Sequence, residues 1–137
     1  MINETHPGFL PLVHIKTKEE MIKVIHNWLS SEEAIQEYCP NMRNPFCLRH
    51  RMDFRTDVGT LLNLGIQASS QLYCTPRKTS LEYGFYSDIQ VDYPSWTFSH
   101  NVIKTYAENT ELPCGTVYPY IPIEVVAEEL LKAVRTL

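Results

Sequence analysis

The chain of 137 residues carries 16 acidic and 12 basic side chains, which gives a formal net charge of −4 at pH 7. A hydrophobic fraction of 44% with only 20% charged residues excludes a disordered chain and is typical of a single globular domain spanning residues 1–137. The negative charge disfavours broad binding to genomic nucleic acid or to an anionic membrane, so we expect any bound anion to be held by a local basic patch.

The N-terminal part of the chain predicts an edge strand followed by a helix. The segment 9–15 is apolar and partly β-branched, but Pro11 interrupts it, which is typical of a short edge strand or an extended arm. Thr17 and Glu20 form a T-x-x-E capping box, and apolar residues at helical spacing follow it. A helix is therefore predicted over 18–29.

A second capping pattern follows directly. Ser30 and Glu33 repeat the spacing of the first box, which predicts a second short helix that ends at Pro40. The turn-forming residues that come next predict a loop over 41–45.

Alternating apolar and polar residues predict strands in the middle of the chain. Between residues 48 and 55 the side chains of Arg49, Arg51 and Arg55 alternate with apolar ones, so we expect these arginines to share one face of a half-buried strand. Further strands are predicted over 61–68, 83–93, 96–103 and 116–120, with polar loops between them.

The last predicted element is an amphipathic helix. Pro122 occupies a favoured first helical position, and apolar residues from Ile123 to Val134 form one stripe opposite a charged face. No repeat, linker or low-complexity tract divides the chain. We therefore predict an α+β fold in which a mostly antiparallel sheet shares one core with N-terminal and C-terminal amphipathic helices.

The sequence shows no targeting, membrane or metal motif. Residues Met1 to Thr5 lack the pattern of a signal peptide, and no apolar run approaches the roughly 20 residues of a membrane span. The cysteines form no CxxC pair and have no histidine at zinc-finger spacing; they are Cys39, Cys47, Cys74 and Cys114. We therefore expect a cytoplasmic protein with reduced thiols, no metal and no cofactor.

No recognisable catalytic motif is present. The chain lacks a G-x-S-x-G elbow, a P-loop, a dinucleotide-binding glycine pattern and HExxH, which favours binding over catalysis and predicts a protein that is not an enzyme. A nucleophile and a base can still meet in space from distant positions. Cys74 or Cys114 with His50 or His100 therefore leaves a small hydrolase open as an alternative.

Two basic segments stand out in this acidic chain: one holds Arg49, His50, Arg51 and Arg55, and the other holds Arg77 and Lys78. Aromatic and amide side chains accompany them. Arginine forks bind phosphate oxygens, aromatic rings stack on bases, and neutral donors and acceptors read a ribose or a base edge. Aromatic residues in loops are favoured over those in strands, because loops on a rigid scaffold often carry function. The candidate ligand-binding residues are Arg51, Arg55, Ser70, Gln71, Tyr73, Arg77, Trp96, Phe98 and Asn101. The alternative for the arginines is a solvated strand face balanced by nearby acids.

Two segments resemble those of small phage-encoded proteins, and the second half of the chain is similar to the Thoeris anti-defence sponges. The segments are Gln67-Ala-Ser-Ser-Gln-Leu-Tyr-Cys-Thr-Pro-Arg77 and Gly115-Thr-Val-Tyr-Pro-Tyr-Ile-Pro-Ile-Glu-Val-Val126. Sponges of this family sequester cyclic ADP-ribose signals and, in some members, cyclic oligonucleotides without cleaving them, as oligomers with pockets between subunits. The resemblance implies a homo-oligomer, a dimer or larger, in the cytoplasm of an infected bacterial host, and it assigns no individual residue.

The first hypothesis is therefore non-enzymatic binding and sequestration of a small anionic nucleotide signal, as in phage counter-defence. The ligand would be of the cyclic ADP-ribose type or a cyclic oligonucleotide. The alternative is a phage-type inhibitor that binds a host protein directly, through the acidic face of the C-terminal helix and exposed aromatic side chains.

Overall fold

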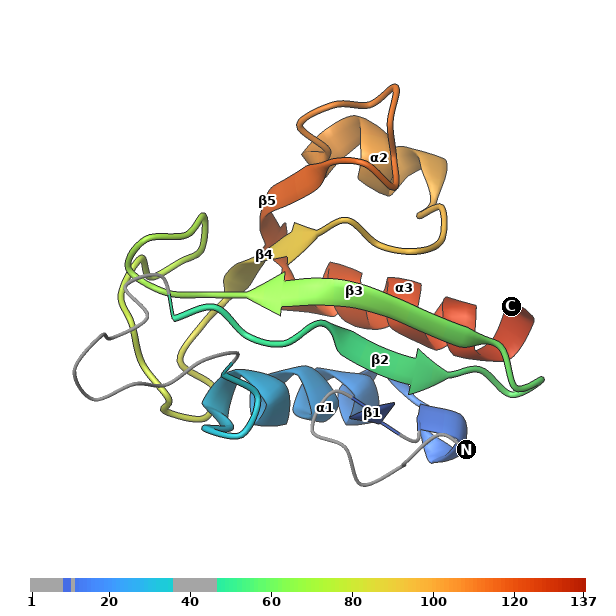
Figure 1. Cartoon of the computed structure of the whole chain (residues 1–137), viewed down its shortest axis with the longest axis horizontal. Coiled ribbons are helices and arrows are strands. Elements are labelled where there is room, and N and C mark those ends of the chain that lie inside the picture. Colours follow the sequence, from blue (N-terminus) through green and yellow to red (C-terminus); the bar gives the residue numbers. More distant parts are fainter. Residues whose placement is uncertain (1–8, 11, 36–46) are drawn as a thin grey trace.

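Five strands form one sheet in the computed structural model, which describes residues 9–10, 12–35 and 47–137 (Figure 1). The strands are β1 (Phe9–Leu10), β2 (Met52–Arg55), β3 (Leu61–Gln67), β4 (Asp88–Asp92) and β5 (Val117–Pro122), and they lie in the sheet in that order. Strands β2 to β5 are antiparallel to their neighbours, whereas β1 pairs in parallel with β2 at the edge. A short 3₁₀ turn, η1 (Leu12–His14), follows β1. The predicted α+β class and the mostly antiparallel sheet are confirmed.

Two long helices cover one face of this sheet and pack beside each other (Figure 1). Helix α1 (Lys18–Ser30) begins at the predicted capping box, in which Glu20 N donates to Thr17 Oγ1 at 3.1 Å and the Glu20 carboxylate accepts from Thr17 N at 3.1 Å. Helix α3 (Ile123–Thr136) begins one residue later than predicted, because Pro122 is its N-cap. Within the described residues no helix is long and apolar enough to cross a membrane.

The core lies between the two helices and the sheet. Helix α1 buries Met21, Ile25, Trp28 and Leu29, and the Trp28 Nε1–H donates to the carbonyl of Ile66 at 3.3 Å. The sheet supplies the buried residues Met52, Phe54, Leu62, Leu64, Ile66, Ile89 and Val91, and α3 supplies Val126, Ala127, Leu130 and Val134. The apolar positions of β2, β3 and β4 thus alternate toward the helices, as the sequence pattern predicted.

The remaining positions of the two central strands face away from α1 and α3. They are Asn63, Gly65 and Gln67 on β3 and Gln90 and Asp92 on β4, and the pairing register places Gly65 opposite Asp92 and Gln67 opposite Gln90. We call this surface the polar face of the sheet. Loops cover part of it, because Gln67 and Gln90 are buried although they point away from the core.

Residues 31–35 form turns, so the second helix predicted after Ser30 is wrong for this segment. Ser31 has extended backbone and ends α1 by donating its N–H to the carbonyl of Trp28 at 3.3 Å. The next residues pair instead with the chain that enters β2: Ala34 O accepts from His50 N at 2.7 Å. The predicted helix end at Pro40 and the loop over 41–45 lie outside the described residues.

Two other predicted strands differ from the structure. Strand β4 covers only 88–92 of the predicted 83–93, because Gly84 takes a left-handed φ of 78° and the chain turns before β4 begins. The strand predicted over 96–103 is wrong, since residues 96–99 are irregular and α2 (His100–Tyr106) follows. Trp96 and Phe98 alternate because both enter the core, which produces a strand-like pattern without a partner strand.

Arg49 does not share a face with Arg51 and Arg55, which corrects another prediction. Its side chain is only 2% exposed and donates from Nη2 to the carbonyl of Leu29 and from Nη1 to that of Ala68, each at 2.8 Å. The regular pairing of β2 with β3 begins only at Met52. At Arg49 the Gln67 side-chain amide takes the place of a strand, since it accepts from the N–H of Arg49 and donates to its carbonyl. The guanidinium thereby supplies donors to a carbonyl at the C-terminal end of α1, where a positive charge is favourable.

Candidate functional site

The sequence-predicted ligand residues do not meet in one cluster. Ser70, Gln71, Tyr73 and Arg77 lie in the loop between β3 and β4, and Trp96 and Phe98 lie in the core. Arg51 directly precedes β2, Arg55 is the last residue of β2, and Asn101 lies on α2. Of these residues, the structure brings together one aromatic ring and one guanidinium, those of Tyr73 and Arg77.

Trp96 and Phe98 are core residues with 8% and 3% of their surface exposed. Their rings meet edge to face with centroids 5.2 Å apart, and Phe54 and Tyr118 lie against them at 5.4 and 5.0 Å. Such an aromatic cluster stabilises the fold through apolar burial and ring geometry. These two rings therefore do not offer a face on which a base could stack.

Arg51 has a structural role at the edge of the polar face. Its Nε and Nη2 donate to Asn63 Oδ1 at 2.9 and 2.7 Å, and the same guanidinium donates to the carbonyls of Asp92 and Tyr93. These bonds join β3 to the end of β4, where Tyr93 takes a left-handed φ of 45°. Arg51 is therefore engaged by the protein itself.

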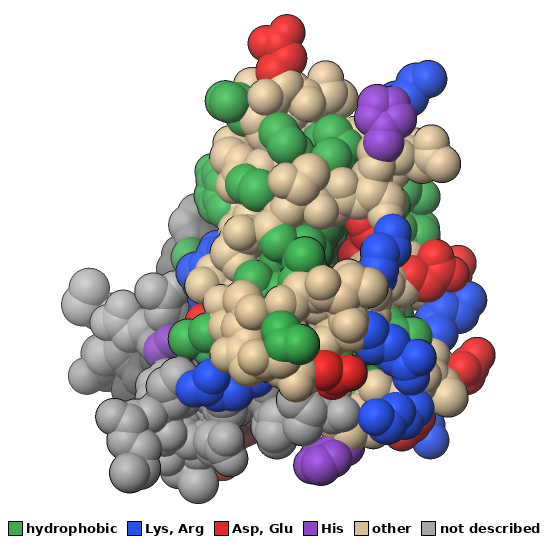
Figure 2. Space-filling model, turned by 90° about the vertical axis from the view of Figure 1, so that its right-hand side faces the viewer, with side chains coloured by type: hydrophobic (Ala, Val, Ile, Leu, Met, Phe, Trp, Pro, Cys, Tyr) green, Lys and Arg blue, Asp and Glu red, His purple; other side chains and the backbone are tan. Residues whose placement is uncertain are grey.

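Arg55 and Asn101 are remote from that region. Arg55 lies at the end of β2 and donates to the carbonyl of Gly59 in the β2–β3 turn at 2.9 Å. Figure 2 looks onto the end of the molecule that holds this turn and the C-terminus, and there basic and acidic side chains are intermixed. Asn101 is exposed on α2. Neither position forms part of a concentrated basic patch.

The exposed site that remains is a pair of tyrosines with an arginine beside them. The rings of Tyr73 and Tyr120 have centroids 5.8 Å apart at an interplanar angle of 50°, and the Arg77 guanidinium lies 5.4 Å from the Tyr73 centroid. Both rings stay open to solvent, with 43% and 44% of each tyrosine exposed. We call Tyr73, Tyr120 and Arg77 the tyrosine platform; it joins two ring surfaces to one positive charge within cation–π distance.

The loop that presents Tyr73 and Arg77 is held on β4 by hydrogen bonds. Thr75 exchanges backbone bonds with the chain at the start of β4, accepting from Ser87 N at 2.9 Å and donating to Asp88 O at 3.2 Å. Cys74 is buried beneath the loop and its thiol donates to the carbonyl of Ser69 at 3.2 Å. Anchored on both sides in this way, the loop holds the platform on a fixed scaffold.

Tyr120 was not among the sequence-predicted residues, and a β-bulge explains its position. The β4–β5 register shifts between Ile89 and Val91, so that two residues of β5, Pro119 and Tyr120, lie opposite Gln90. Tyr120 takes a left-handed φ of 51°, and its N–H donates to the carbonyl of Tyr73 at 3.1 Å. Bulges redirect side chains and occur next to functional sites. A tyrosine held in this backbone region costs roughly 1–3 kcal/mol, which the surrounding contacts must offset.

Gln90 connects the platform to a carboxylate. Its side chain is 8% exposed; Oε1 accepts from Tyr73 N at 3.1 Å, and Nε2 donates to Asp92 Oδ1 at 2.8 Å. Buried amides of this kind are costly unless both ends are bonded. The single amide therefore fixes the backbone of Tyr73 and the carboxylate of Asp92 relative to each other.

The Asp92 carboxyl lies on the polar face directly over Gly65. A Cβ on Gly65 would come within 2.9 Å of Asp92 Cβ and 3.2 Å of Oδ2, so only glycine leaves room for this side chain. Burial raises the pKa of Asp92, while the bond from Gln90 and the nearby Arg51 charge act in the opposite direction. Oδ2 has no hydrogen-bond donor among the residues that the structure describes.

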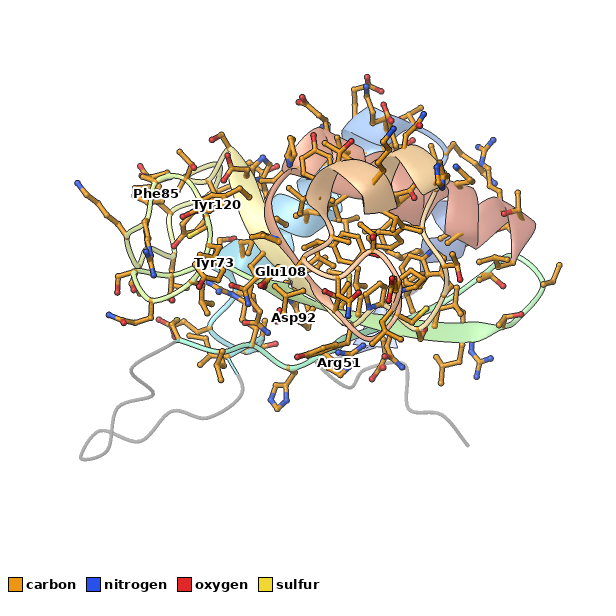
Figure 3. The ribbon with its side chains drawn as sticks, turned by 90° about the horizontal axis from the view of Figure 1, so that it is seen from above. Arg51, Tyr73, Phe85, Asp92, Glu108 and Tyr120 are labelled. Atoms are coloured by element: carbon orange, nitrogen blue, oxygen red, sulfur yellow. The ribbon has the colours of Figure 1, made fainter. Side chains whose placement is uncertain are left out.

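The tyrosine platform, Asp92 and Arg51 lie in a strip across the molecule (Figure 3). Figure 3 shows Tyr120, Tyr73, Glu108, Asp92 and Arg51 along one line of the view. The order agrees with the contacts, because Glu108 N donates to the carbonyl of Val117, the residue of β5 that pairs with Asp92. The strip thus runs from rings and a cation at one end to carboxylates near its middle.

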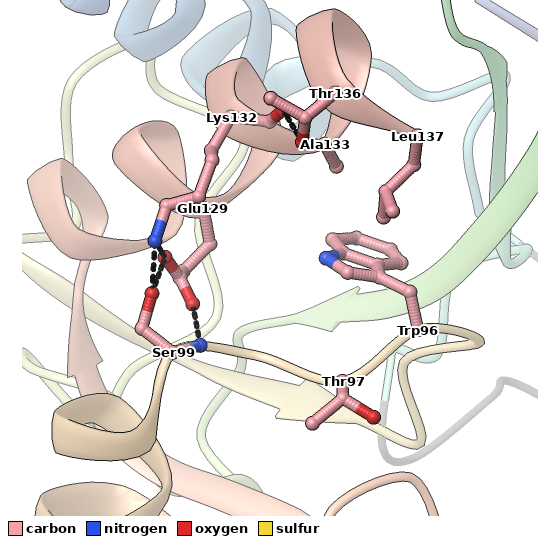
Figure 4. Close-up of a pocket in the computed structure, with 8 residues that line it drawn as sticks. All are labelled: Trp96, Thr97, Ser99, Glu129, Lys132, Ala133, Thr136 and Leu137. Carbon is pink, nitrogen blue, oxygen red and sulfur yellow. Dashed lines mark hydrogen bonds and ion pairs between the residues drawn. The ribbon is translucent and has the colours of Figure 1, made fainter.

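A hollow of about 190 Å³ lies between Trp96 and helix α3 (Figure 4). The buried Glu129 accepts from both the backbone N and the hydroxyl of Ser99, and Lys132 donates to Ser99 Oγ and pairs with Glu129 at 3.5 Å. The three polar groups satisfy one another and fix the start of α2 to α3. We therefore assign them a structural role.

Two cysteines, Cys74 and Cys114, were nucleophile candidates in the sequence, and the surroundings of Cys74 disfavour that role. Burial raises the pKa of the Cys74 thiol, which opposes formation of a thiolate, the opposite of the change found in reactive cysteines. Cys114 is exposed, and its Sγ lies 4.0 Å from Thr97 Oγ1. In the described part of the chain, no group of three or more His, Cys, Asp or Glu side chains is placed to hold a metal ion.

The chain matches no protein-family model, no curated protein and no solved structure. The resemblance to the sponge family therefore stays a prediction, and the functional conclusion depends on the residues themselves.

Proposed function

We propose that the protein binds a small nucleotide-type anion at the tyrosine platform and does not change it chemically. The observation that carries the proposal is the Arg77 guanidinium held 5.4 Å from one ring of an exposed, fixed tyrosine pair. The protein has a formal net charge of −4, so a cation presented in this way attracts an anion locally and not over the whole surface.

Each part of the platform suits one part of such a ligand. A base stacks on the exposed ring surface of Tyr73 and Tyr120, and Arg77 donates to a phosphate with its planar fork. Apolar stacking and charge-assisted hydrogen bonds need no catalytic group. Capture of a signal then proceeds by mass action and requires only sufficient affinity and protein concentration.

The ligand class of this proposal is the one expected from the sequence, a cyclic ADP-ribose-type molecule or a cyclic oligonucleotide sequestered in phage counter-defence. The proposal includes a homo-oligomer, and light scattering on the purified protein tests that part. The tyrosine platform changes which residues are responsible: Tyr120 joins Tyr73 and Arg77, whereas Trp96 and Phe98 are removed because they are buried.

The test is calorimetry with cyclic ADP-ribose, a cyclic dinucleotide and adenosine 5′-diphosphate. Stacking contributes about 1–3 kcal/mol per base, so Tyr73→Ala should weaken binding by roughly 5- to 150-fold. Arg77→Gln should weaken binding and flatten its dependence on salt. The matched control is Tyr83→Ala, which removes another exposed tyrosine, one that packs against His26.

Two results would contradict the proposal. If no compound of the panel binds at micromolar protein, or if Tyr73→Ala and Tyr83→Ala bind equally well, the platform is not a nucleotide site. Mass spectrometry of the recovered ligand separates capture from hydrolysis, because a captured ligand returns unchanged.

The same exposed tyrosines also fit a second function, direct inhibition of a host protein. Tyrosine is enriched at the centres of protein interfaces, and Tyr73 and Tyr120 form a two-ring anchor. A host protein that co-purifies in stoichiometric amount and is lost in Tyr73→Ala would favour this function over ligand capture.

A further inference from the structure

The polar face beside the tyrosine platform holds a carboxylate that nucleotide stacking alone does not use. Asp92 is connected to Tyr73 by two consecutive hydrogen bonds through Gln90, of 3.1 and 2.8 Å. With the dimensions of one amide between them, Asp92 Oδ1 lies within about 9 Å of the Tyr73 backbone nitrogen. One buried amide therefore fixes Asp92 relative to the backbone of the residue that presents the first ring of the platform.

The hydrogen bonding of Asp92 leaves one side of its carboxyl available. Gln90 occupies Oδ1, whereas Oδ2 receives no donor from the described residues. A carboxylate is acceptor-only and offers about four lone-pair sites, so Asp92 can accept from hydroxyl groups in addition to Gln90. It repels phosphate for the same reason. The two charged groups therefore favour different parts of a ligand: Arg77 favours its anionic part, and Asp92 favours its hydroxyl groups.

The position of Asp92 is set by its surroundings. Gly65 lies directly beneath its Cβ, and Gln90 is buried and bonded at both ends. Arg51 donates to the backbone carbonyl of Asp92 and holds the end of β4 in place. An acceptor fixed in advance discriminates between ligands better than a mobile one, because no ordering of the side chain opposes binding.

We infer that Asp92 makes the site select nucleotides with a free pair of neighbouring ribose hydroxyls over those that lack one of them. This inference rests on the proposed function, since it requires a base on the tyrosine platform. Asp92 is a specificity-determining residue that accepts hydrogen bonds from the sugar, and Gln90 is the positioning residue that aligns it with Tyr73.

The experiment compares adenosine 5′-diphosphate with its 2′-deoxy form by calorimetry. A hydroxyl bonded to a fixed carboxylate should make the wild-type protein bind the ribonucleotide about tenfold or more tightly. Asp92→Asn should lose most of that preference, because the amide replaces one acceptor oxygen of the carboxylate by a donor. The control Asp57→Asn alters an exposed carboxylate beside the β2–β3 turn and should keep the preference.

Failure of this inference and failure of the proposed function give different results. If both nucleotides bind equally to the wild type and to Asp92→Asn while Tyr73→Ala still weakens both, the platform stands and the role of Asp92 is wrong. If neither nucleotide binds at all, both ideas are overturned. Gln90→Glu provides a second variant, which places a second negative charge beside Asp92. It should reduce the preference for the ribonucleotide. Binding of the 2′-deoxy form to this variant reports whether the platform is intact.

Discussion

The contact between Gly65 and Asp92 leads to a defined expectation for Gly65→Ala. The new Cβ would lie 2.9 Å from Asp92 Cβ, whereas carbon atoms attract best at roughly 3.5–4.0 Å. Each Cβ is bonded directly to the Cα of a residue in the paired β3–β4 register, so neither can turn aside as the end of a flexible side chain would. The two strands must separate locally, or the Asp92 side chain must leave the polar face.

Two opposing terms set the size of the effect. Overpacking of this kind costs about 1–3 kcal/mol. Replacing glycine by alanine inside a strand gains roughly 0.5–1 kcal/mol, because glycine loses more conformational freedom on folding. The middle values of the two terms leave a loss of about 1 kcal/mol in the free energy of unfolding, or a fall in Tm of about 3–4 °C.

Urea unfolding measures this loss as a lower transition midpoint with an unchanged slope. The matched control is Gly115→Ala, for which the closest atom to the new Cβ is Leu112 Cβ at 3.4 Å, and we expect little change there. In a background of Asp92→Gly the cost of Gly65→Ala should shrink, since the clashing Cβ is gone. Equal stability of Gly65→Ala and the wild type would show that the close approach of the two strands is not a feature of the protein.

Two further expectations concern a buried hydroxyl and a helix cap. Tyr118→Phe removes the bond from Tyr118 Oη to the carbonyl of Pro113 at 2.7 Å and should cost about 1 kcal/mol at pH 7. Burial raises the pKa of Tyr118 to about 12, so between pH 10 and 12 the unfolded chain releases this proton whereas the folded chain keeps it. The stability of the wild type should therefore fall over this range more steeply than that of Tyr118→Phe. Denaturant titrations at several pH values measure the difference. Thr17→Ala removes the acceptor for Glu20 N in the α1 capping box and should cost about 1 kcal/mol in urea unfolding, whereas Thr105→Ala on the exposed side of α2 should be nearly neutral.

The tyrosine platform shows how far a sequence can predict a site in this fold. Tyr73 and Arg77 were identifiable because a loop aromatic and a basic side chain lie only four positions apart, and local spacing decides whether they can meet. Tyr120 is 47 positions from Tyr73 and became a partner only through the bulge in β5. The sequence signal that could have pointed to it is Pro119, because a proline in a strand marks an edge or a bulge.

The positions of the arginines and aromatic residues were harder to predict, because each of these side chains can either bond or pack inside the protein or lie at its surface. Arg49, Arg51 and Arg55 alternate along the chain, yet Arg49 bonds carbonyls in the interior and Arg51 bonds Asn63 beside the polar face. Trp96 and Phe98 lie in a segment without regular structure and still enter the core. Which partner a long side chain reaches depends on elements that are distant in the sequence.

Helices α1 and α3, strand β3 and the α+β class were determined by the sequence itself, since a capping box and apolar periodicity act over a few neighbouring residues. Tertiary structure alone decided that β5 bulges at Tyr120, that Gly65 makes room for Asp92, and that Gln90 joins this carboxylate to Tyr73. The physical reason is that each of these contacts forms between strands or loops whose separation is set by how the whole sheet pairs, and no local pattern encodes that distance.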